Sequence, residues 1–190
     1  MKIGFILPYA LALFVSTSVA RPSIWESCGS DAVLLKESTF EHDGHVVKVA
    51  TTSCPGFANL TSTTFATPSR VNKRAVSQCN LSLSACNVLC DSLLPQPTVL
   101  DCNTLTLSLL VQPNTFSSPP FTFTTFTMGT CLYGFANFDL VTYDVCPTAL
   151  AIYGLKTSTQ CVAGSPSTLT GFCTSLGLLN NNWVMEVVHS

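Results

Sequence analysis

Ten cysteines in 190 residues are the feature of this sequence that most constrains its fold. No two of them form a C-x-x-C motif, so neither a metal site nor another cofactor is indicated. An even number of cysteines in an exported chain predicts disulfides instead. We expect Cys28 to pair with Cys54 across a hairpin pattern, and Cys161 with Cys173 around a loop. The other six stay without assigned partners: Cys79, Cys86, Cys90, Cys102, Cys131 and Cys146.

The first twenty residues have the pattern of a secretory signal peptide. Lys2 is followed by an apolar run of 13 residues, Ile3 to Val15, which is too short to span a bilayer of about 30 Å as a helix. Ser18-Val19-Ala20 has the small-x-small cleavage pattern. We therefore predict cleavage after Ala20 and a secreted, extracellular protein with no membrane span; a retained anchor is the alternative.

Composition changes sharply at Lys73-Arg74. Residues 21–74 hold six Lys/Arg and five Asp/Glu, whereas residues 75–190 hold one lysine, no arginine and five acids. The dibasic pair follows a linker rich in Thr, Ser and Pro, the kind of segment that proteases cut. Its pattern predicts kexin-type processing, which would make residues 21–74 a front segment removable as a propeptide; an uncut linker is the alternative. Two cysteines precede the pair and eight follow it, so each piece could satisfy its own bonds.

The front segment carries a hairpin pattern and a possible glycosylation site. Residues 32–40 and 45–51 alternate like strands around the turn signal Asp43-Gly44. Asn59 lies in the sequon Asn-Leu-Thr, and a second sequon of the chain, Asn-Leu-Ser, starts at Asn80. We expect Asn59 to be the more accessible acceptor, because Asn80 neighbours Cys79.

Residues 75–190 predict an α+β domain, an antiparallel sheet with packed helices that disulfides stabilise. Its anchor is the stretch 129–146, which begins as a strand at Cys131 and turns at residues 137–139. The other expected elements are an amphipathic helix over 81–94, a strand over 104–111, an antiparallel strand over 121–128 with a bulge near Thr124–Thr125, a helix from Pro147 that Gly154 ends or kinks, and a final strand over 183–189.

No catalytic constellation stands out in this domain. Its one histidine is His189, and a single lysine argues against phosphate chemistry and nucleic acid. Paired carboxylates among Asp139, Asp144 and Glu186 are the remaining enzymatic alternative. We therefore expect a protein that is not an enzyme.

Low charge and many Thr, Ser and Asn residues favour binding of neutral sugars, which stack on aromatic rings. The candidates are Trp183, Tyr133, Tyr143, Asn137 and Asn182. An exposed Trp183–Tyr133 patch would favour glycan binding. The same rings buried, beside a flat uncovered strand edge, would favour a secreted structural or effector protein that contacts a protein or the cell wall.

Four motifs together resemble the mushroom glycan-binding lectin family, the ink-cap "Y-three-like" domain of secreted fungal proteins. They are CNVLC followed by LDCNTLTLSLL, then TCLYGFANFDLVTYDVC, the late Cys161 and Cys173, and the terminal NNWVMEVVHS. The sequence departs from the family pattern where Asp144 and Val145 separate Tyr143 from Cys146. The resemblance implies an αβα sandwich, a glycan or glycoprotein partner, and a homodimer formed through sheet edges.

Overall fold

A computed structural model describes residues 24–61, 75–82, 86–92, 95–164, 170–175 and 182–190. The expected signal peptide with its cleavage site at Ala20, and the dibasic pair Lys73-Arg74, lie outside these residues. Within them, no helix is both long enough and apolar enough to cross a membrane.

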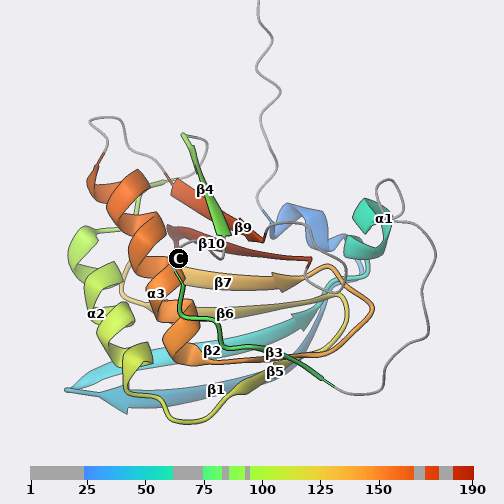
Figure 1. Cartoon of the computed structure of the whole chain (residues 1–190), viewed down its shortest axis with the longest axis horizontal. Coiled ribbons are helices and arrows are strands. Elements are labelled where there is room, and N and C mark those ends of the chain that lie inside the picture. Colours follow the sequence, from blue (N-terminus) through green and yellow to red (C-terminus); the bar gives the residue numbers. More distant parts are fainter. Residues whose placement is uncertain (1–23, 62–74, 83–85, 93–94, 165–169, 176–181) are drawn as a thin grey trace, which may run out of the picture.

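A seven-stranded antiparallel sheet forms the centre of the molecule (Figure 1). Its strand order is β1-β2-β6-β7-β10-β9-β4, so the last strand of the chain lies inside the sheet. The strands are β1 (Val33–His42), β2 (His45–Ser53), β6 (Thr122–Met128), β7 (Cys131–Asn137), β10 (Trp183–His189), β9 (Thr170–Ser175) and β4 (Cys86–Asp91). The α+β class with an antiparallel sheet, expected from the sequence, is therefore present.

Two helices, α2 (Val99–Leu110) and α3 (Pro147–Thr157), lie side by side on one face of this sheet (Figure 1). The hydroxyl of Thr98 caps α2 by accepting the backbone N–H of Asp101, and Pro147 occupies the first turn of α3, where its missing N–H costs nothing. Between helices and sheet lies the larger core, which contains Leu105, Leu150 and Met185.

A small second sheet extends the layer of helices. It has the strand order β3-β8-β5, from β3 (Val76–Gln78), β8 (Tyr143–Val145) and β5 (Phe116–Ser118). The segment η2 (Ser158–Ala163) continues α3 as a wider, π-helical turn.

Two short helices of the front segment cover part of the opposite face of the large sheet. They are η1 (Glu26–Cys28) and α1 (Phe57–Thr61), and the disulfide between Cys28 and Cys54 joins η1 to the chain just before α1. Together with residues of the sheet they form a second, smaller core. The described residues thus place long helices on one face and only these two short helices on the other.

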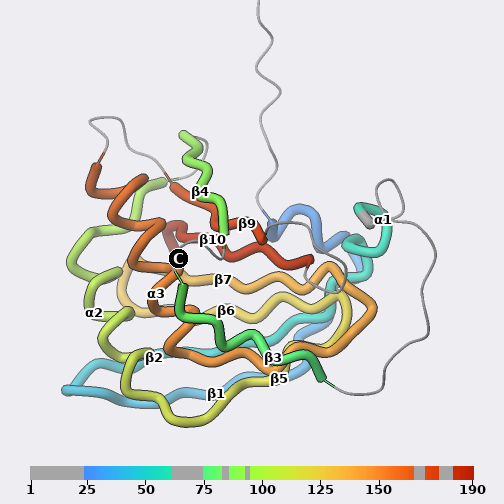
Figure 2. The backbone as a smooth tube through the Cα atoms, viewed as in Figure 1, coloured from blue at the N-terminus to red at the C-terminus, as the bar shows by residue number. Residues whose placement is uncertain are grey.

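The predicted front hairpin is present, and it belongs to the same sheet as the rest of the chain. Asp43 and Gly44 form its turn with positive φ angles, and His42 pairs with His45. Strand β2 then pairs with β6 over six residue pairs, from Lys48↔Thr127 to Ser53↔Thr122. Figure 2 shows the two strands side by side, although Thr51 and Thr124 are 73 residues apart in sequence.

Two secondary-structure predictions were wrong, in opposite directions. The expected strand over 104–111 belongs to helix α2, whose buried residues Cys102, Leu105 and Leu109 follow a helical spacing while Leu107 faces solvent. The expected helix over 81–94 contains strand β4, which pairs with β9 from Cys86↔Ser175 to Asp91↔Thr170. In both places alternating and helical patterns coexist in the sequence.

Three smaller predictions also change. The pairing of β6 with β2 and β7 is continuous, so there is no bulge at Thr124–Thr125; its side chains alternate irregularly because both faces are buried. Strand β6 pairs with these two strands and not with residues 104–111. Helix α3 passes through Gly154 to Thr157.

All ten cysteines are paired in five disulfides. The predicted pair Cys28–Cys54 is present. The predicted pair Cys161–Cys173 is wrong, because both residues bond to strand β4: Cys161 to Cys90, and Cys173 to Cys86. The remaining bonds join Cys79 to Cys146 and Cys102 to Cys131.

Candidate functional site

Two of the aromatic residues proposed for sugar stacking lie in the main core. Trp183 is 2% exposed and lies between the rings of Phe135 and Tyr153, at centroid distances of 5.6 and 5.3 Å. Tyr133 is fully buried, and its hydroxyl bonds to Thr106 and to the backbone carbonyl of Cys102. Neither ring offers a face to a ligand in this arrangement.

Tyr143 and Asn137 instead hold a turn together. The buried Tyr143 hydroxyl donates to Asp139 (2.9 Å) and accepts the backbone N–H of Asn182 (3.0 Å). The amide of Asn137 donates to the carbonyls of Ser118, Pro119 and Val141, and its oxygen accepts the N–H of Asp139. Burial raises the pKa of Tyr143. This network ties β7 to β8 and to the start of β10, and it leaves none of the buried polar atoms of these side chains without a partner.

The three carboxylates considered for catalysis lie in different surroundings. Asp139 takes part in the turn just described, and Asp144 is half-exposed in β8. Glu186 is 2% exposed, beneath the front segment, where one oxygen accepts the backbone N–H of Ile24. A carboxylate covered in this way borders no open cleft.

An open hollow lined by rings, polar groups and one charge lies beside the front hairpin. It has a volume of about 420 Å³ and separates the hairpin from the segment around β5. Its rings, Phe40, Phe116 and Phe126, lie among uncharged polar side chains, and Lys36 is the one charged residue of its lining. The polar lining residues are Ser38, Thr51, Gln112, Asn114, Thr115, Ser117 and Thr124. We call this hollow the hairpin groove.

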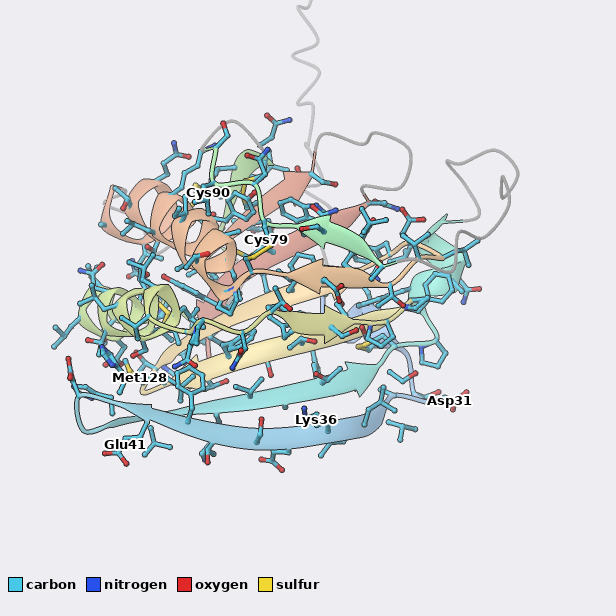
Figure 3. All side chains as sticks on the ribbon, turned by 60° about the horizontal axis from the view of Figure 1, so that its bottom comes forward. Asp31, Lys36, Glu41, Cys79, Cys90 and Met128 are labelled. Atoms are coloured by element: carbon cyan, nitrogen blue, oxygen red, sulfur yellow. A yellow bond between two sulfur atoms is a disulfide. The ribbon has the colours of Figure 1, made fainter. Side chains whose placement is uncertain are left out.

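Strand β1, beside the groove, is one edge of the large sheet, and within the described residues only β2 pairs with it. Three consecutive apolar residues near its start, Val33, Leu34 and Leu35, are 57%, 56% and 55% exposed. The pairing with β2 shifts between Leu34 and Lys36, so Leu35 is a bulged residue. Figure 3 shows Lys36 and Glu41 further along this outer strand.

A second hollow, of about 470 Å³, lies between the hairpin tip and helix α2. His42 and His45 border it together with Leu107 and Leu110, and Nε2 of His42 lies 3.3 Å from the carboxylate of Asp43. No group of three or more metal-ligating side chains is found in the described part of the chain.

Both glycosylation sequons lie in described segments. Asn59 is exposed in the short helix α1. Asn80 is also exposed, and its side-chain oxygen accepts the backbone N–H of Ser82. The hydroxyl of Tyr153 donates to the backbone carbonyl of Asn80, which fixes the chain there against α3.

The comparisons with known proteins give no support for a family: no family model matches this chain, and neither a curated protein nor a solved structure matches it. Sequence reasoning missed the hairpin groove and the β1 edge, because it treated the front segment as separate from the domain. The run Val33-Leu34-Leu35, three apolar residues without alternation, was the available signal.

Proposed function

We propose that this protein is a secreted, non-catalytic binding protein that contacts a partner protein through the β1 edge. The observation that carries the proposal is the run Val33-Leu34-Leu35, three exposed apolar side chains on a strand with no outer neighbour among the described residues. Consecutive exposed apolar residues are uncommon on soluble proteins and mark contact surfaces. The five disulfides and the signal-peptide pattern of residues 1–20 support secretion.

An extended segment of a partner would suit this edge. A strand added to β1 gains main-chain hydrogen bonds, and its alternate side chains can enter neighbouring hollows. The hairpin groove begins at Leu35 and continues along Lys36, Ser38 and Phe40 of the same strand. The bulge at Leu35 and the charges of Lys36 and Glu37 oppose indiscriminate pairing, so they would favour selected partners.

A second copy of the chain is one possible partner. Two β1 strands related by a two-fold axis could pair edge to edge, which would produce the homodimer implied by the lectin resemblance. Light scattering on the purified protein distinguishes this case from a foreign partner.

Glycan binding in the hairpin groove is the second candidate function. The groove offers half-exposed rings, Phe40 and Phe116, among neutral hydroxyl and amide groups, which is the chemistry that neutral sugars require. This candidate retains the ligand class of the lectin family and places it on other residues than Trp183 and Tyr133.

One sample serves to test both candidates. The uncleaved protein, with Lys73→Ala and Arg74→Ala, is screened at pH 5.5 against a displayed library of random peptides and against a glycan array. If β1 is the binding surface, selected peptides will have alternating apolar residues, and Leu34→Glu will weaken their binding at least tenfold. Leu100→Glu is the matched control, since Leu100 is 74% exposed on the distant helix α2.

The groove variant Phe116→Ala separates the two candidates. Saturable glycan binding that Phe116→Ala removes and Leu34→Glu leaves intact would replace the protein-contact proposal by the glycan proposal. If the peptide library yields no sequence that distinguishes Leu34→Glu from Leu100→Glu, and the protein is monomeric, the β1 proposal is refuted.

A further inference from the structure

The disulfides divide this chain into two covalent units. Cys28–Cys54 lies within the front segment, and the other four bonds lie within residues 75–190. No disulfide joins the two units, so residues 62–74 provide their only covalent link. A cut in this link would leave two chains held by non-covalent contacts alone.

Those contacts are extensive. The pairing of β2 with β6 adds the front segment to the sheet, and the backbone N–H of Cys54 donates to the carbonyl of Phe121 at its end (2.8 Å). Phe57 of the front segment is fully buried, and its ring centroid lies 4.4 Å from that of Phe138. The interface therefore combines a strand pairing with an apolar core, as within a single domain.

One polar group interrupts this apolar interface. Glu186 points from β10 toward the front segment and is 2% exposed. One of its oxygens accepts the N–H of Ile24, while the other, Oε2, has no hydrogen-bond partner among the described residues. A Cβ on Gly134 would lie 2.9 Å from Cγ of Glu186 and 2.4 Å from the ring of Phe123, which shows how closely this carboxyl is packed.

We propose that the front segment is a separable subunit: once the chain is cut between residues 61 and 75, it stays bound to the sheet at acidic pH and is released as Glu186 ionises. The surface that receives it is the face formed by Phe123, Ala136, Phe172 and Glu186. Its occupant is residues 24–61 of the same protein. This inference concerns assembly and holds independently of what β1 binds.

No cation among the described residues compensates Glu186. Strands β6, β7 and β9, which surround it, contain no charged residue. On η1 the charged residue is Glu26, which is exposed and has the same sign; Lys48 of β2 is exposed and lies three strands away from β10. Burial raises the pKa of Glu186 to about 7, against 4.5 for the free side chain.

The direction of the pH effect follows from these two values. With the front segment bound, Glu186 holds its proton up to about pH 7. In the separated domain water reaches the carboxyl, so we expect its pKa to return to the 4.5 of the free side chain. Association therefore takes up a proton between these pH values and weakens as the pH rises. From pH 5 to pH 8 the dissociation constant is expected to increase about 70-fold.

The test uses the full chain with the recognition sequence of a site-specific protease in place of residues 70–74. The folded protein is cut at pH 5, and the dissociation constant of the two pieces is measured by native mass spectrometry and size exclusion over a dilution series at pH 5 and pH 8. We expect joint elution at pH 5 and the 70-fold weakening at pH 8. In Glu186→Gln the two values should agree within about threefold.

Two further variants separate the carboxyl from general loosening. Glu37→Gln on the exposed face of β1 should keep the full pH dependence. Phe57→Ala should weaken association at both pH values and leave their ratio unchanged. The proposal is overturned if the wild-type pieces separate equally at both pH values, if they stay together equally at both, or if Glu186→Gln separates more readily than wild type.

Discussion

The ring of Tyr133 lies directly against the Cα atom of Gly154. A Cβ placed on Gly154 would lie 2.2 Å from Cε2 of Tyr133, well inside van der Waals contact. The ring cannot move away easily, because its hydroxyl bonds to Thr106 and to the carbonyl of Cys102. Gly154 thus allows α3 to approach the sheet closely.

This contact predicts that Gly154→Ala destabilises the protein. Alanine favours a helix by about 1 kcal/mol over glycine, but overpacking a core costs about 1–3 kcal/mol, and here the clash is with a bonded ring. We expect a net loss of roughly 1 kcal/mol or more in the free energy of unfolding, measured in urea on the oxidised protein. Leu155→Ala, at the exposed neighbour, should change the stability much less. A stabilised Gly154→Ala variant would contradict the close approach.

The buried carboxyl of Glu186 predicts how stability depends on pH in the uncut chain. Folding raises its pKa from 4.5 to about 7, so the folded state binds more protons than the unfolded state in this range. The contribution of Glu186 to stability is therefore fully present below about pH 4.5, decreases as the pH rises, and is lost above about pH 7, with a total loss of up to about 3 kcal/mol. Urea titrations from pH 4 to pH 8 measure this slope, and Glu186→Gln should flatten it.

Asp101 predicts that stability decreases as the pH falls, at lower pH values than the effect of Glu186 and with the opposite sign. Its carboxylate accepts the backbone N–H of Thr130 (2.7 Å) and the Thr130 hydroxyl (2.6 Å), and these bonds lower its pKa below 3.8. The stability that it adds is present above pH 3.8 and is lost as the pH falls through the lowered pKa. Asp101→Asn should cost about 1 kcal/mol at pH 6 and less at pH 2. Equal costs at both pH values would show that charge plays no part.

The disulfide topology predicts a specific peptide map. Digestion without reduction should yield a fragment that joins Cys86 to Cys173 and another that joins Cys90 to Cys161. Mass spectrometry distinguishes them from the sequence-based alternative, a Cys161–Cys173 fragment. Finding that alternative fragment would mean that β4 does not pair with β9 as described.

The sequence predicted elements whose pattern is unambiguous. The hairpin around Asp43-Gly44, the strand from Cys131 and the helix from Pro147 all have strong local signals: a turn dipeptide, period-two alternation, and proline at a helix start. Where the apolar residues fit both the helical period and the strand period, tertiary contacts decide which element forms. The spacing of Leu105 and Leu109 fits both a strand and a helix. The hydrogen bond that Thr130 donates to Asp101, in the first turn of α2, favours the helix.

The candidate site was less predictable, for a physical reason. Aromatic rings next to Asn and Asp side chains resemble a sugar site in sequence, yet Tyr143, Asp139 and Asn137 form the same combination to stabilise a buried turn. Sequence alone also could not reveal that β2 pairs with β6, because paired residues such as Thr51 and Thr124 are 73 positions apart. The hairpin groove exists only through that pairing.

The position of β10 in the middle of the sheet has a consequence for biosynthesis. Strands β7 and β9 can only be joined after the ribosome has made the chain through His189, since β10 pairs with both. Cys86 and Cys90 must likewise wait for Cys173 and Cys161, which are synthesised more than 70 residues later. The domain therefore cannot fold step by step as it emerges. If the protein is secreted, as proposed, its early cysteines depend during that interval on the oxidoreductases of the secretory pathway to avoid bonding to the wrong partners.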